Sequence, residues 1–169
     1  MMLPVELPVS RSVLLHPRAP YHFDANLYKP SHFPSSDTSW TPGTLRTTMI
    51  WGEEAFGLRF RSEGTAWRPR IRLTVYSRAA LPEGGFRRVI EEIRWRFNLD
   101  QDIASFCRGY RNDRVLGPAV RRWRGMKPVA GNSLYETLVV YVVLQNAVVR
   151  RSIQMLEALF RRFGSRLVF

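Results

Sequence analysis

The spacing of apolar residues changes once along this chain, at Pro82, and this change constrains the fold more than any other feature. Before it, residues 70–76 alternate apolar and polar side chains, which is the period of a half-buried β-strand. After it, the apolar residues between positions 86 and 97 recur at intervals of three and four, the period of an amphipathic helix. The sequence therefore predicts an α+β fold, with a small N-terminal antiparallel sheet and helices (residues 1–97) followed by an all-helical segment (98–169).

Turn-forming residues divide the first part into four expected strands, over residues 21–28, 45–51, 55–61 and 70–76. The segment after Pro82 is expected to form a helix that covers the sheet. Asn98 followed by Gln101 has the spacing of a capping box and predicts a second helix, whose inward residues would be Ile103, Phe106 and Tyr110.

Three more helices are expected further along. A short one covers residues 113–123 and ends before Gly125 and Pro128. Ser133 with Glu136 forms another capping-box pattern and begins a strongly apolar helix that ends near residue 144. The last runs from about residue 149 to 163, with apolar residues on one face and Gly164 at the position of a C-terminal cap.

The positive charge is concentrated in the second part of the chain. Residues 1–107 contain 14 basic and 11 acidic side chains, whereas residues 108–169 contain 12 basic and 3 acidic ones. All but two of the basic residues are arginines, which bind phosphates through a planar fork and stack on bases. We expect a polyanionic partner for this half, although a GC-rich genome or a high growth temperature also produces an arginine bias.

Other residue types indicate little specialised chemistry. The lone Cys107 allows no intramolecular disulfide and is expected in the core. His16, His22 and His32 lack thiol or carboxylate neighbours at metal-ligand spacing, so no metal or other cofactor is expected. The N-terminus has no basic segment typical of a signal peptide, and the longest apolar run is too short to cross a membrane. We expect a cytoplasmic protein associated with the nucleoid.

The segment from 144 to 151, between the two apolar helices, combines amides with arginines. Gln145 and Asn146 stand at the junction and should cap a helix or face the solvent, because unpaired buried amides are costly. Arg150 and Arg151 follow in the first turn of the next helix, where free N–H groups attract phosphates. Such a junction would suit a DNA backbone, and an ordinary polar loop with solvated arginines is the alternative.

Residues 97–164 resemble the helix-hairpin-helix DNA glycosylases, nearest to the 3-methyladenine glycosylase II and 8-oxoguanine glycosylase branches. The resemblance is carried by residues 134–138, by the Leu144-Gln145-Asn146 segment and by residues 150–155 with the aromatic-glycine pair at 163–164. It implies a DNA-repair enzyme that removes modified purines from double-stranded DNA. The small sheet domain expected at the N-terminus is also typical of that family.

The resemblance assigns roles to four residues. Asn146 corresponds to the residue that fills the gap left by an extruded nucleotide, and Gln145 to the amide beside it. Arg151 corresponds to an arginine that contacts the orphaned partner base in the 8-oxoguanine branch. Arg150 is expected to contact a phosphate.

The family's catalytic residues lie further along its chains, in a glycine-rich hairpin and an aspartate after it. This sequence ends at Phe169, before any counterpart, and Asp100, Asp102 and Glu136 are expected in helix caps. We therefore expect no catalytic residue in this chain. It would be either part of a glycosylase completed by a C-terminal half, with exposed apolar helices that could also self-associate, or a non-catalytic DNA-binding module. An arginine-rich RNA-binding protein is a third possibility, but it does not explain the amide junction.

Overall fold

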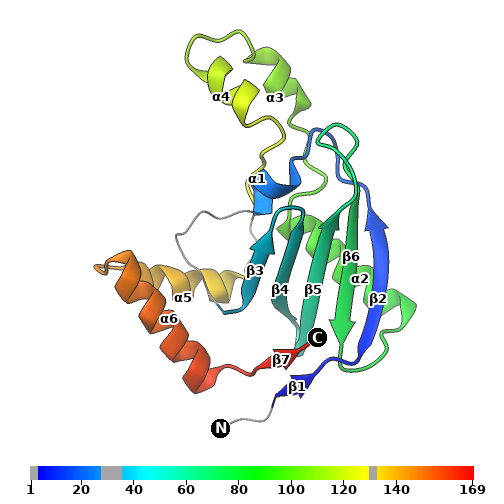
Figure 1. Cartoon of the computed structure of the whole chain (residues 1–169), viewed down its shortest axis with the longest axis vertical. Helices are drawn as coiled ribbons and strands as arrows, with labels where there is room; N and C mark the ends of the chain where they lie inside the picture. The colour runs from blue at the N-terminus through cyan, green and yellow to red at the C-terminus, as the bar shows by residue number, and fades with distance from the viewer. Residues whose placement is uncertain (1–3, 28–35, 130–132) are drawn as a thin grey trace.

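The computed structural model describes residues 4–27, 36–129 and 133–169, and shows the predicted α+β fold (Figure 1). Its centre is a five-stranded antiparallel sheet in the order β2-β6-β5-β4-β3. The strands are β2 (Val9–Leu15), β3 (Thr38–Thr41), β4 (Thr44–Trp51), β5 (Glu54–Ser62) and β6 (Ile71–Ser77). Strands β3 to β6 are consecutive neighbours, and β2 lies beside β6 at the edge.

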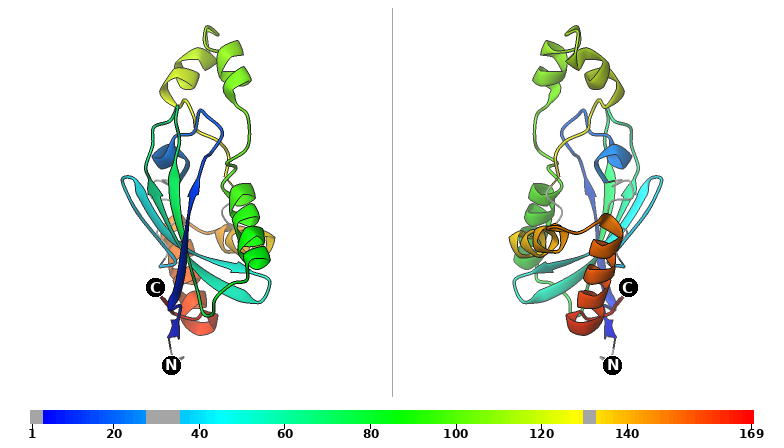
Figure 2. Two further views of the ribbon diagram at one scale, coloured as in Figure 1. Left: turned by 90° about the vertical axis from the view of Figure 1, so that its right-hand side faces the viewer. Right: turned by 90° about the vertical axis from the view of Figure 1, so that its left-hand side faces the viewer.

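Helix α2 (Glu83–Arg96) covers one face of this sheet (Figure 2). Its apolar side presents Phe86, Val89 and Ile93, all buried, to the large side chains of β5 and β6. The core therefore lies between α2 and the inward residues of the strands, and it includes Phe56, Leu58, Phe60, Leu73 and Val75. Burial of this many large apolar groups supplies the main driving force for folding.

The three central strands were expected at residues 45–51, 55–61 and 70–76, and the structure confirms β4, β5 and β6 at these places. The strand expected over residues 21–28 is wrong, because Phe23–Leu27 form the short helix α1, and residue 28 lies outside the described part. The polar side chains of this segment bind backbone groups instead of alternating across a strand. His22 Nδ1 accepts the Ala25 N–H at 3.1 Å, and Asn26 Oδ1 accepts the Lys127 N–H at 2.6 Å.

Two short helices, α3 (Ala104–Gly109) and α4 (Leu116–Arg122), project from one end of the sheet (Figures 1 and 2). The expected capping box at Asn98 is wrong, since α3 begins only at Ala104. Asn98 instead ends α2: it has φ +50°, its N–H bonds to Trp95 O at 3.0 Å, and the next N–H bonds to Arg94 O at 2.9 Å. These two hydrogen bonds form a Schellman motif, in which Asn is tolerated at the left-handed position.

The side chains of α3 also differ from expectation. Phe106 and Tyr110, predicted to point inward, are about half exposed and stack on each other with ring centres 4.8 Å apart. Cys107 is the residue of this helix that is buried, although it lies outside the main core cluster.

The last two helices, α5 (Leu134–Leu144) and α6 (Val149–Phe163), form a helical hairpin beside the β3 edge of the sheet (Figure 1). After α6 the chain returns to the sheet domain, which the sequence did not predict. Strand β7 (Leu167–Val168) pairs in parallel with β1 (Val5–Glu6). Phe169 then lies directly against Gly57 and contacts the Tyr76 ring, with centres 5.2 Å apart.

Candidate DNA-probing site

The α5–α6 hairpin begins with the predicted capping box. The Ser133 hydroxyl accepts the Glu136 N–H at 3.2 Å, and the Glu136 carboxylate accepts the Ser133 N–H at 2.5 Å. Glu136 also lies 4.0 Å from the guanidinium of Arg96, which is buried at the end of α2. The start of α5 is thus fixed both locally and against the helix that covers the sheet.

A buried hydroxyl holds the two helices of the hairpin together. Ser152, on α6, is fully buried and donates to the carbonyl oxygen of Val143 on α5 at 3.2 Å. Val143 and Leu156 are also buried between the helices. On the far side, Glu157 accepts the N–H and the hydroxyl of Ser36 at 3.0 and 3.2 Å, which ties α6 to the segment leading into β3. These contacts therefore hold the turn between α5 and α6 in a fixed position.

The turn itself exposes the two predicted amide residues. Gln145 ends α5 with φ −63° and ψ 123°, and Asn146 follows with φ +56°. The Ala147 N–H bonds back to Leu144 O at 3.3 Å. These angles and this bond are those of a type II turn, which requires a residue that tolerates positive φ at its third position, usually Gly or Asn. Both amide side chains are exposed at the tip of the hairpin.

Arg150 and Arg151 lie directly after this turn, in the first turn of α6, and both are exposed. Val148, at the N-cap, supplies no side-chain hydrogen bond to the helix end. The first turn of α6 therefore has free N–H groups and two arginines, and it contains no acidic residue. This arrangement favours the binding of an anion. The structure thus brings together all four residues that the sequence singled out.

The candidate carboxylates are engaged elsewhere. Asp100 binds the guanidinium of Arg94 through both oxygens, and Asp102 accepts the Ala104 N–H at 2.8 Å and pairs with Arg18 at 2.6 Å. Glu136 belongs to the capping box, as predicted. Residues 4–27, 36–129 and 133–169 contain no group of three or more potential metal ligands, and His32 lies outside them. Within the same residues, no helix has the length and apolar character needed to cross a membrane.

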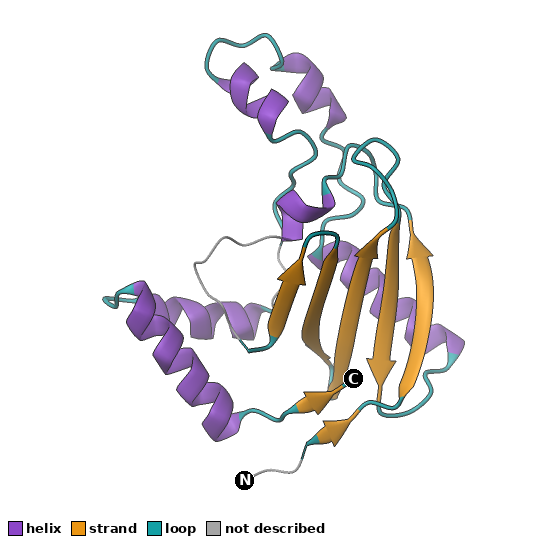
Figure 3. Ribbon diagram, in the orientation of Figure 1, coloured by secondary structure: helices purple, strands orange, loops and turns teal. Residues whose placement is uncertain are grey.

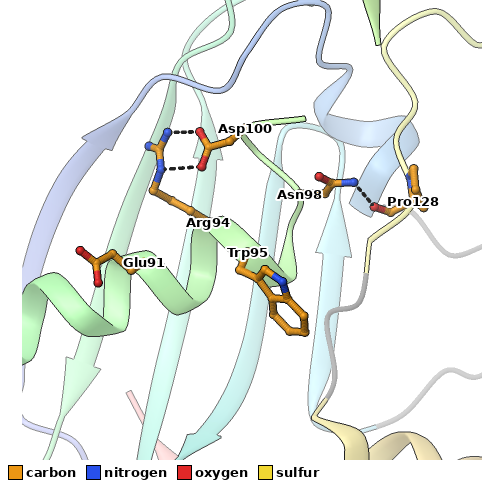
Figure 4. A pocket seen from close by; sticks show the side chains of 6 residues that line it. All are labelled: Glu91, Arg94, Trp95, Asn98, Asp100 and Pro128. Atoms are coloured by element: carbon orange, nitrogen blue, oxygen red, sulfur yellow. Dashed lines mark hydrogen bonds and ion pairs between the residues drawn. The ribbon is translucent and has the colours of Figure 1, made fainter. Parts of the chain in front are cut away.

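A hollow of about 500 Å³ lies at the end of α2, lined by Glu91, Arg94, Trp95, Asn98, Asp100 and Pro128 (Figure 4). Its polar groups are largely paired with one another: Arg94 binds Asp100, and the Asn98 amide donates to Pro128 O at 2.9 Å. None of its lining residues comes from the α5–α6 hairpin. This hollow is therefore separate from the candidate site.

Apolar side chains on α5 remain uncovered beside the candidate site. Leu134 and Tyr135 are each 76% exposed, and the remaining members of the face are Leu138, Tyr141 and Val142, all more than half exposed. Neighbouring exposed apolar side chains of this kind are typical of surfaces on which another chain or segment packs. Exposed apolar helices were expected for a chain that is one part of a glycosylase completed by a C-terminal half.

Comparison with known proteins identifies a fold. No protein-family model and no curated protein sequence matches this chain. Among solved structures, it is similar to a 3-methyladenine DNA glycosylase from Archaeoglobus fulgidus, with a TM-score of 0.67 and 11% sequence identity. The alignment covers 89% of this chain and 50% of the archaeal one, so the chain spans about half the length of that enzyme. The fold is therefore glycosylase-like.

Proposed function

We propose that this chain is the DNA-probing part of a base-excision DNA glycosylase of the helix-hairpin-helix type. It would bind damaged duplex DNA and help to turn a modified purine, alkylated or oxidised, out of the helix. The observation that carries the proposal is the exposed Gln145-Asn146 turn, followed by Arg150 and Arg151 at an uncapped helix end. The glycosylase-like fold supports it.

Each residue of the turn would have a distinct task. Asn146 would enter the duplex and fill the space left by the extruded nucleotide, which offsets part of an unstacking cost of a few kcal/mol. Gln145 would support it from the neighbouring position, and Arg151 would contact the orphaned base. Arg150 would hold a phosphate together with the free N–H groups of α6.

Hydrolysis of the N-glycosidic bond would need a second half, because the carboxylates of the hairpin are already engaged. Glu136 caps α5 and Glu157 holds Ser36. The uncovered face of α5 offers a surface on which a C-terminal glycosylase half could pack. The protein would then act in the cytoplasm, with the nucleoid.

Substitutions at position 146 test the proposal. Asn146→Ala should reduce the preference for a duplex with an abasic or damaged site over an intact one, by about tenfold if the side chain contributes roughly 1.4 kcal/mol. Because positive φ is costly for Ala, Asn146→Gly is the matched variant: it keeps the turn and removes the same amide. Both variants should lose the preference, measured by fluorescence anisotropy with labelled duplexes.

Arg150→Ala should behave differently. It should weaken binding to damaged and intact duplexes alike and lower the slope of log K against log salt by about one unit, as expected for one lost phosphate contact. Wild-type preference retained in Asn146→Gly, or equal wild-type affinity for damaged duplex and for RNA of the same length, would exclude the proposed function.

A further inference from the structure

The outer face of the five-stranded sheet, opposite α2, carries arginines in register. Figure 3 shows this face toward the viewer, with α2 behind it and β7 at its lower end. Arg46 on β4 lies directly opposite Arg59 on β5, and Arg61 on β5 lies directly opposite Arg72 on β6. Since side chains alternate along a strand, these four arginines share one face, and all are exposed.

This arrangement has an electrostatic cost. Like charges directly opposite each other across an antiparallel pair destabilise the sheet, because their Cβ atoms are only about 5 Å apart. One of the four is neutralised: Arg72 makes two hydrogen bonds to Glu63, at 2.7 and 3.0 Å. This bond, and more weakly the charges of Arg61 and Arg70, hold the pKa of Glu63 below its ordinary value.

The remaining three arginines have no carboxylate partner among the described residues. Arg59 contacts the face of the Tyr76 ring, 5.9 Å from its centre, which leaves its charge uncompensated. The other outward strand positions are neutral. On β2, β3, β4 and β6 they carry mainly hydroxyl groups, from Ser10, Ser12, Ser39, Thr41, Thr44, Thr48, Thr74 and Tyr76. No outward position within these five strands carries an acid.

The face is also open. Phe169 covers it at Gly57, towards one end, and the described helices leave Arg46, Arg59 and Arg61 exposed to solvent. A hydroxyl-rich surface with uncompensated arginines matches the phosphate oxygens of nucleic acid in charge and in hydrogen bonding.

We propose that this face is a second DNA-binding surface, on which Arg46, Arg59 and Arg61 hold the phosphodiester backbone of duplex DNA. The choice of duplex DNA as the partner rests on the proposed function. The surface lies on the sheet and not on the α5–α6 hairpin, so it would add affinity without reading the lesion. Binding would neutralise the repulsion between Arg46 and Arg59 that the free protein tolerates.

The double variant Arg46→Gln/Arg59→Gln tests this surface in the full chain. It should bind intact duplex roughly tenfold or more weakly near 0.1 M salt and lower the salt slope by about two units, because two phosphate contacts are lost. Its melting temperature should stay the same or rise, since a like-charge pair is removed. The ratio of affinities for damaged and intact duplex should not change.

The matched control is Arg87→Gln/Arg88→Gln, which removes the same charge from two exposed arginines of α2, on the covered side of the sheet. It should keep near wild-type affinity. Equal losses in the two double variants, no loss in the sheet variant, or tighter binding of single-stranded RNA through the same arginines would overturn the inference. The two proposals can fail separately. If the sheet variant loses affinity but the lesion preference does not depend on Asn146, this surface is supported and the proposed function is excluded. If the lesion preference depends on Asn146 but the sheet variant loses no affinity, the proposed function is supported and this surface is excluded.

Discussion

At the scale of single residues, the same sequence pattern led to two different structures. Ser133 with Glu136 forms the predicted capping box, whereas Asn98 with Gln101 does not. The difference comes from what precedes each residue. Asn98 directly follows α2 and takes the left-handed conformation that ends that helix, so it cannot also begin the next one. Local spacing identifies a cap but not the helix end to which it belongs.

Lys127 shows that a basic residue counted in the sequence is not always available to bind a partner. It was counted with the basic residues of the second half, but it is buried and its ammonium donates to three carbonyl oxygens, of Arg18, Leu99 and Gln101, at 2.6 to 3.4 Å. Burial lowers the pKa of Lys127, and the charges of Asp100 and Asp102 oppose this shift. Its role is structural, because its hydrogen bonds hold residues 99 and 101 beside Arg18.

Lys127→Met should therefore lower the free energy of unfolding by about 2–4 kcal/mol, since it removes the three hydrogen bonds that the ammonium donates to backbone carbonyl groups. Urea denaturation measures this change. Arg122→Met, at an exposed position of α4, is the control and should stay within about 0.5 kcal/mol of the wild type. A Lys127→Met variant as stable as this control would show that water satisfies the three carbonyls.

At the scale of secondary-structure elements, the segments with a strong apolar pattern were predictable and the edge strands of the sheet were not. The central strands β4 to β6 and the helices α2 and α6 have clear apolar periods, helix α5 is strongly apolar, and the structure confirms these elements. The edge strand β2 was missed because only one of its seven residues is buried and its polar and apolar residues show no regular alternation. Helix α1 depends on bonds to distant backbone groups, such as those between Asn26 and residues 125 and 127.

The projecting helix α4 offers a pH test at this scale. Asp113 Oδ1 accepts the N–H groups of Leu116 and Val115 at 2.7 and 2.8 Å, and these bonds lower the pKa of the Asp113 carboxyl. A lowered folded-state pKa means that the stabilisation is complete above the ordinary value of 3.8 and is lost as the pH falls through the folded value. Asp113→Ala should melt at a lower temperature than the wild type at pH 6, and this difference should disappear near pH 2. A difference that persists at acid pH would contradict a stabilising role of these two hydrogen bonds.

At the scale of the whole molecule, the four candidate site residues lie between positions 145 and 151, so their proximity could be anticipated without the fold. The supports behind them could not be anticipated, because Ser152 and Glu157 make their contacts across the hairpin and to the segment before β3. The arginines of the sheet face also become neighbours only when β4, β5 and β6 pair in register.

The chain alone should release no free base from alkylated or oxidised duplex DNA. The carboxylates of the hairpin are committed to structure, and under the proposed function the catalytic group belongs to a second half. Base release is measured by chromatography after incubation with damaged duplex, against a buffer control. Release above that control would require a catalytic group within this chain.

The pairing of β1 with β7 has a consequence for how the chain acquires its structure. All five strands of the main sheet lie within the first 77 residues, so the sheet can assemble while the rest of the chain is still being synthesised. The β1–β7 ladder joins residues 5–6 to residues 167–168 and can form only after residue 168 has left the ribosome. Closing such a long loop comes late. The covering of Gly57 by Phe169 is thus a late step of folding, after the sheet beneath it has assembled.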